Sequence, residues 1–285
     1  MNGRSDAGAW VKSPLERLSL NQATVQSWGV RETIEGCARH GIPYVGLWRD
    51  KLAQEGVESA RRLLEETGVK VSSLCRGGFF PAPTESERRE RIDDNRRAID
   101  EAAAVGTDVL VLVCGGIAGR DLEGSRRMVE EGIAEVLPYA SERGVKLGIE
   151  PLHPMFAADR SVICTLGQAV AMAQRLDSAA VGVVVDVYHV WWDDQVYELI
   201  ERATGRIIGF HVDDWLAPPP DVLMGRGMMG DGAIDLSGLF EAVARAGYDG
   251  PVEVEIFNRD IWETPADEVV ALMKERYRRH VLGDG

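Results

Sequence analysis

The sequence has only four cysteines, and they lie far apart. Cys37, Cys75, Cys114 and Cys164 form no CxxC pair, and a chain of 285 residues can fold without disulfides, so we expect reduced thiols. Neither the first ten residues nor any later segment has the apolar run of a signal peptide or of a membrane span. The sequence therefore predicts a cytoplasmic protein that makes no membrane contact.

The sequence is also short of basic residues. It has 32 lysines and arginines against 46 acidic residues, which gives a formal net charge of -14. Nucleic-acid surfaces depend on clustered Lys and Arg, so we expect no nucleic-acid partner and favour a small-molecule substrate. With 45% hydrophobic and 27% charged residues, the composition excludes disordered and fibrous classes and allows one large core.

Strand-like apolar runs alternate with segments of helical periodicity along the whole chain. The expected strands are 18–21, 44–48, 69–75, 108–114, 145–150, 181–185, 207–210 and 252–254. The expected helices are 29–40, 57–67, 86–105, 124–143, 165–176, 193–203, 235–246 and 266–280. Eight β/α units predict a (β/α)8 TIM barrel, an α/β fold that forms one domain over residues 1–285. An open doubly wound sheet is the alternative, but no GxGxxG pattern follows the first strand.

Four polar residues stand where four successive strands end. They are Glu150, Asp186, His211 and Glu255. Because the carboxyl ends of barrel strands form one face, these side chains are expected to converge on one divalent metal ion. Carboxylates combined with imidazole suit Mn, Co, Fe or Zn, whereas Ca or Mg sites are more often all oxygen. Glu253 competes with Glu255 because both lie on the same strand face, and Glu255 is preferred because it is nearer the carboxyl end.

The segments around these residues resemble a known family. Gly148-Ile-Glu-Pro-Leu-His-Pro, Val185-Asp-Val-Tyr-His, Gly209-Phe-His-Val-Asp-Asp and Pro251-Val-Glu-Val-Glu-Ile-Phe are similar to motifs of the xylose isomerase-like TIM barrel superfamily, and most of all to its sugar phosphate isomerase/epimerase members.

The resemblance implies a divalent ion, Mn²⁺ first, with Co²⁺, Fe²⁺, Mg²⁺ or Zn²⁺ as alternatives. In the ketose 3-epimerase branch the matching glutamates also carry protons, so Glu150 and Glu255 are the implied catalytic residues. His189 matches that branch's substrate-binding histidine, and Arg226 matches its arginine more loosely.

Further candidates rest on position alone. His153 either faces the barrel mouth or has a structural role, and of the adjacent Trp191 and Trp192 we expect one to pack and Trp191 to contact substrate. An apolar wall near Arg76 is expected from Trp48, Phe79 and Phe80. The long segment 212–233 is interpreted either as a lid over bound substrate or as a surface loop.

The expected reaction is enolisation of a keto sugar, for which an unphosphorylated substrate is favoured. Reprotonation would make the enzyme an isomerase or epimerase of carbohydrate metabolism. Loss of a β substituent would instead make it a lyase, either an inosose-type dehydratase or the barrel subunit of a 3-oxo-glycoside C-deglycosidase. A homo-oligomer is expected in the first case, and a complex with a small β-rich subunit in the deglycosidase case. A zinc-dependent DNA-repair endonuclease is disfavoured by five histidines and the acidic charge, and a noncatalytic binding protein would leave the metal ligands unexplained.

Overall fold

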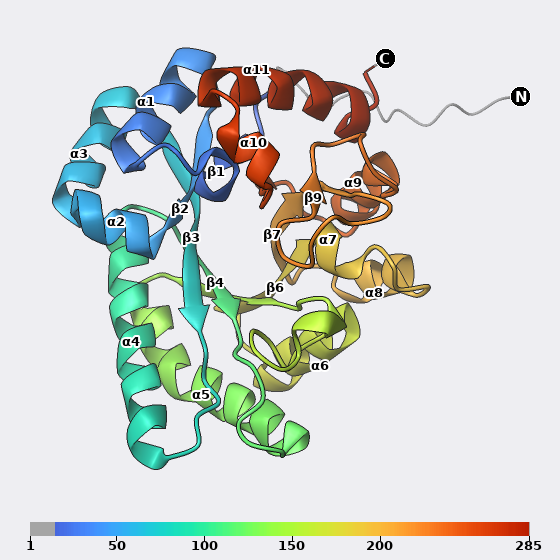
Figure 1. Ribbon diagram of the computed structural model, residues 1–285. Coiled ribbons are helices and arrows are strands. Elements are labelled where there is room, and N and C mark those ends of the chain that lie inside the picture. Colours follow the sequence, from blue (N-terminus) through green and yellow to red (C-terminus); the bar gives the residue numbers. More distant parts are fainter. Residues whose placement is uncertain (1–14, 285) are drawn as a thin grey trace, which may run out of the picture.

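The computed structural model describes residues 15–284, which form a closed barrel of eight parallel strands (Figure 1). Its strands are β1 (Leu18–Asn21), β2 (Tyr44–Trp48), β3 (Lys70–Gly78), β4 (Val109–Val113), β5 (Lys146–Glu150), β6 (Val181–Asp186), β7 (Ile207–Val212) and β10 (Val252–Val254). Around the barrel their order is β1-β10-β7-β6-β5-β4-β3-β2. The predicted (β/α)8 barrel is therefore confirmed.

Every barrel strand is followed by at least one helix, and Figure 1 shows these helices around the outside of the barrel. The α-helices are α1 (Val30–His40), α2 (Arg49–Glu55), α3 (Val57–Thr67), α4 (Glu85–Ala104), α5 (Leu122–Glu142), α6 (Leu166–Leu176), α7 (Val187–Val190), α8 (Val196–Arg202), α9 (Leu236–Arg245), α10 (Arg259–Glu263) and α11 (Ala266–Arg276). Short turns of other helix types are η1 (Gln22–Val25), η2 (Pro154–Phe156) and η3 (Tyr277–Val281).

Local sequence explains why these elements begin and end where they do. All residues of β4 and β6 are buried, as expected for parallel strands covered on both faces. Helix α4 begins with a capping box, in which Thr84 and Glu87 satisfy each other's backbone N–H groups. Helix α1 ends at Gly41, whose φ of 65° favours glycine.

Several segments differ from the sequence-based expectation, among them helices α2 and α10, which were not expected. Strand β3 runs to Gly78 because a bulge at Arg76 lets the pairing with β4 continue past Cys75. Helix α8 begins at Val196 because a separate turn, α7, follows β6 directly. The segment 212–233 contains a two-stranded ribbon, in which β8 (Asp214–Trp215) pairs with β9 (Arg226–Gly227).

A buried carboxylate at the start of the ribbon segment holds the end of that segment. Asp214 accepts hydrogen bonds from the backbone N–H groups of Gly230, Gly232 and Ile234. This part of the segment is thus anchored, while residues 217–222 are exposed at its tip.

Two further expectations were that the cysteines form no disulfides and that no segment spans a membrane. All four cysteines are free and buried. Within residues 15–284, no helix is both long and apolar enough to cross a membrane.

Candidate metal centre and active site

The four predicted metal ligands come together at the carboxyl end of the barrel. Glu150 is the last residue of β5 and Asp186 the last residue of β6. His211 is the penultimate residue of β7, and Glu255 directly follows β10. These strands are consecutive neighbours in the barrel, and Asp186 pairs in register with His211. One ligand atom from each of the four residues lies within 4.8 Å of those of the other three, and all four side chains are buried.

The charge of this cluster fits a divalent cation. Glu150 Oε1 and His211 Nδ1 are buried 3.3 Å apart, but among the described residues neither has a hydrogen bond of acceptable geometry. Such orphaned atoms are rare unless an ion or a water satisfies them. A cation bound by three carboxylates and one imidazole would supply the missing partner and balance charges that are costly to bury.

The two glutamates have opposite electrostatic environments. Burial raises the pKa of Glu150 to about 7, although His211 acts in the opposite direction. For Glu255, burial also favours the neutral form, but Arg226 and His211 outweigh it and lower the pKa to about 2. Glu150 therefore has the higher proton affinity of the two.

Glu253 lies on the other side of His211 from Glu255. His211 turns Nδ1 toward Glu150 and Glu255, at 3.3 and 3.7 Å, and Nε2 toward Glu253 Oε1, at 3.8 Å. Both Glu253 oxygens accept hydrogen bonds, from Asn21 Nδ2 at 2.6 Å and from the Ser72 hydroxyl at 2.6 Å. This geometry favours Glu255 as the ligand and makes Glu253 the carboxylate that orients the imidazole.

Arg226 crosses the site from the ribbon segment. Its Nη1 lies 2.9 Å from Asp186 Oδ2, 2.8 Å from Asp213 Oδ2 and 3.0 Å from Glu255 Oε2. Burial alone would lower the Arg226 pKa, but these carboxylates hold it well above the ordinary value. Arg226 is thus a permanent cation that touches two of the four candidate ligands.

His189 is held as a neutral imidazole. Burial lowers its pKa to about 3. Both ring nitrogens face donors, Nδ1 the His153 backbone N–H at 3.1 Å and Nε2 the Arg226 Nη2 at 3.2 Å. A neutral imidazole accepts at one nitrogen only, so at most one of these contacts is a hydrogen bond. Nε2 also lies 3.7 Å from Asp186 Oδ2, so this edge of the ring faces the candidate metal cluster.

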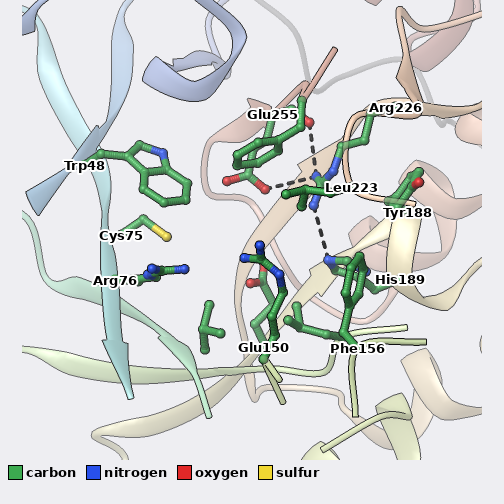
Figure 2. A pocket seen from close by; sticks show the side chains of 14 residues that line it. Trp48, Cys75, Arg76, Glu150, Phe156, Tyr188, His189, Leu223, Arg226 and Glu255 are labelled. Carbon is green, nitrogen blue, oxygen red and sulfur yellow. Dashed lines mark hydrogen bonds and ion pairs between the residues drawn. The ribbon is translucent and has the colours of Figure 1, made fainter. Parts of the chain in front are cut away.

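A cavity of about 450 Å³ of empty space, open mouth included, lies over the cluster. Figure 2 shows Glu150 and Glu255 entering it from different strands, with Arg226 linked to Glu255 and His189. The remaining wall is largely apolar and aromatic, formed by Trp48, Val113, Leu152, Phe156, Tyr188, Leu223 and Phe257.

Some predicted residues lie elsewhere. Phe80 is buried in the core and does not line the cavity. His153 and Trp191 are also absent from its lining; His153 packs its ring between Trp192 and Trp215, and Trp191 packs on Trp215. Their contact with substrate stays a prediction that this geometry does not support.

Other residues at the site were missed from the sequence. Asn21 donates from Nδ2 to Glu253 and Glu255, and its Oδ1 accepts from the Trp48 indole. It ends β1, so its position at a strand end was the available signal. Asp213, two residues after His211, has a pKa raised well above its ordinary value by burial.

The comparisons with known proteins agree with this architecture. Residues 34–276 match the family model described as xylose isomerase-like TIM barrel, so the chain belongs to that family. An inosose isomerase from Bacillus velezensis is 24% identical over 91% of this chain and 95% of its own length. The L-ribulose-5-phosphate 3-epimerase UlaE of Shigella sonnei is 28% identical over 72% of this chain and 70% of its own.

Solved structures show the same fold. The protein SMc04130 from Sinorhizobium meliloti 1021 is 51% identical, with a TM-score of 0.92 over 93% of this chain and 98% of that chain. The IOLI protein, solved with a bound zinc atom, is 22% identical, with a TM-score of 0.84 over 94% and 99% of the two chains.

Proposed function

We propose that the protein is a divalent-metal-dependent isomerase or epimerase that acts on a keto sugar or a related polyol ketone. One observation carries the proposal: two glutamates of a buried four-ligand cluster face a single cavity from different strands. Relatives named as an inosose isomerase and a ketose-phosphate 3-epimerase support the same reaction class.

The four ligands would be Glu150, Asp186, His211 and Glu255. When bound, the ion would polarise adjacent carbonyl and hydroxyl oxygens and so acidify the carbon beside the carbonyl. We expect Mn²⁺, because a mixed set of carboxylates and one imidazole suits borderline divalent ions; Co²⁺, Fe²⁺, Mg²⁺ and Zn²⁺ are the alternatives.

The chain's own residues would then move the proton. Glu150 is the proposed base, since in the metal-free site it is the glutamate with the higher proton affinity. The electron pair of the broken C–H bond moves to the carbonyl oxygen. Glu255, ionised at rest, would take a proton from water and deliver it to the opposite face, which inverts the centre, while Glu150 releases the abstracted proton to solvent. Delivery to the former carbonyl carbon, with transfer of the neighbouring hydroxyl proton to the former carbonyl oxygen, would instead isomerise the sugar. The His189 imidazole and the Arg226 guanidinium would hold substrate oxygens.

The apolar wall of the cavity favours a second candidate. Trp48, Phe156, Leu223 and Phe257 offer little to a fully hydroxylated sugar but suit an aglycone. The same enolisation followed by loss of a β substituent would make the protein a lyase, such as a 3-oxo-glycoside C-deglycosidase subunit or an inosose-type dehydratase. A small β-rich partner would support the deglycosidase, and a homo-oligomer the isomerase.

Proton NMR in deuterated water tests the proposal. The metal-loaded protein is incubated with ketoses, inososes and 3-oxo-glycosides, then again after chelation. We expect loss of one carbon-bound proton signal that stops with chelator, and the product distinguishes epimer, isomer and elimination. Solvent exchange that is equally fast without metal, or in the Glu150→Gln variant, would contradict the proposal.

A further inference from the structure

Three arginines line the cavity with Glu150 and Glu255, and two of them, Arg76 and Arg160, make no contact with the candidate metal ligands. Arg76 lies near the carboxyl end of β3, and Arg160 follows η2 in the connection after β5. Within residues 15–284, no carboxylate lies within ion-pair distance of Arg76, and only the adjacent Asp159 approaches Arg160, at 3.8 Å. Neither guanidinium donates a hydrogen bond to a described residue. Both are therefore charged groups with unused donors inside a site.

Aromatic rings, not acids, hold these guanidiniums. Arg76 Cζ lies 4.7 Å from the centre of the Phe79 ring and 5.8 Å from that of Trp48, and Arg160 Cζ lies 5.7 Å from that of Phe156. Stacking on a ring engages the face of the guanidinium and leaves its N–H edge free. A planar fork of donors is suited to the oxygens of a carboxylate or a phosphate.

The backbone around Arg76 is built to turn this side chain inward. In the pairing of β3 with β4, Cys75 and Gly77 face consecutive residues, so Arg76 is the extra residue of a bulge. Bulges near active sites re-aim a side chain. The buried Asn95 of α4 clamps the strand just beyond it, accepting from the Gly78 N–H at 2.7 Å and donating to the Gly78 carbonyl at 2.8 Å. Figure 2 shows Arg76 pointing into the cavity.

Nearby arginines are used differently. Arg49, whose Nη1 approaches the Arg76 carbonyl oxygen at 3.4 Å, is paired with Asp94 and Glu101. Arg226 is surrounded by three carboxylates. The charges of Arg49 and Arg226 are thus neutralised within the protein, whereas the charges of Arg76 and Arg160 are available to a ligand.

We propose that Arg76 and Arg160 together form an oxyanion subsite, so that the substrate carries a carboxylate or a phosphate at the end remote from its carbonyl. The proposal deepens the proposed function and rests on it for the position of the reacting carbon. It replaces the sequence-based preference for an unphosphorylated sugar with a requirement for negative charge, in either of two chemical forms.

Binding of compounds that cannot be enolised tests the subsite without turnover. Ribitol, ribonate and ribitol 5-phosphate are titrated calorimetrically into the metal-loaded protein. We expect at least one of the two anions to bind tenfold to a hundredfold more tightly than ribitol, as charge-assisted hydrogen bonds imply. The Arg76→Met and Arg160→Met variants, which keep an apolar stem of similar length, should each lose most of that preference. In the wild type, tighter binding of ribonate would identify a carboxylate subsite, and tighter binding of ribitol 5-phosphate a phosphate subsite.

A matched control is Arg39→Met. Arg39 also stacks on an indole, with Cζ 5.5 Å from the Trp28 ring centre, but it lies outside the cavity. It should keep the anion preference, and unchanged melting temperatures would show that all three variants fold. An anion preference that survives in both cavity variants would mean that the metal centre binds the anion, and would overturn the proposal.

Solvent-exchange kinetics separate this proposal from the proposed function. With neutral and anionic keto sugars of equal chain length, the cavity variants should raise KM for the anionic one by about tenfold or more and leave the neutral one unchanged. An equal loss for both would mean that the arginines only balance the charge of the site, which refutes the subsite. If no substrate exchanges, the enolisation proposal fails while the calorimetric result still decides the subsite.

Discussion

Metal affinity should depend steeply on pH, because the pKa values of two of the ligands are raised. The pKa of Glu150 is raised to about 7 by burial, and that of His211 is held well above its ordinary value by its acidic neighbours. A proton and a cation compete for the same lone pairs, so the affinity must fall as the pH falls.

The magnitude follows from the two groups. With a pKa of about 7, Glu150 is about one-tenth protonated at pH 8 and almost fully protonated at pH 5.5, which weakens metal binding about thirtyfold. The raised pKa of His211 steepens this loss of affinity in the same direction. Glu255 contributes nothing here, since its pKa of about 2 leaves it ionised.

Calorimetry in buffers of different ionisation enthalpy counts the protons released per ion. At pH 6 we expect the wild type and Glu255→Gln each to release about one proton more per ion than Glu150→Gln, although both variants bind more weakly. A wild-type affinity that is flat between pH 5.5 and 8, or equal proton counts in the two variants, would refute the electrostatic reasoning.

Three other changes have distinct expected results. Glu150→Gln should reduce solvent exchange by about a hundredfold to ten-thousandfold at saturating metal, with circular dichroism unchanged. Glu253→Gln should weaken metal binding by about tenfold to a hundredfold but recover turnover when metal is added in excess, because its carboxylate only orients His211; a variant that stays inactive with excess metal would make Glu253 a ligand. Thr84→Ala removes the capping box of α4 and should cost about 1 kcal/mol in urea unfolding while leaving metal affinity unchanged; lost metal affinity would contradict the separation of cap and site.

The barrel and the ligand cluster could be predicted because both follow from local patterns. Buried runs such as Val181–Asp186 mark strands, and the carboxyl ends of barrel strands share one rim, so Glu150, Asp186, His211 and Glu255, each at or next to such an end, could be expected to converge without knowledge of any contact.

What lies between elements could not be predicted in this way. Arg160 reaches the cavity because the connection after β5 folds back toward the residues that follow β4. There the Arg160 carbonyl oxygen accepts a hydrogen bond from the Gly115 N–H at 2.8 Å. Arg76 enters because of a one-residue bulge that no periodicity reveals. His153 and Trp191 were expected at the cavity because they are close in sequence to Glu150 and His189, but they do not line it. Closeness in sequence does not determine the side of a loop on which a ring packs.

The metal content of the purified protein tests the central claim most directly. After loading with Mn²⁺ at pH 7.5 and exhaustive dialysis, elemental analysis of the wild type should give about one ion per chain, and His211→Ala should retain only a small fraction of it. Equal metal content in the wild type and in His211→Ala would contradict a metal centre built from the four strand-end residues.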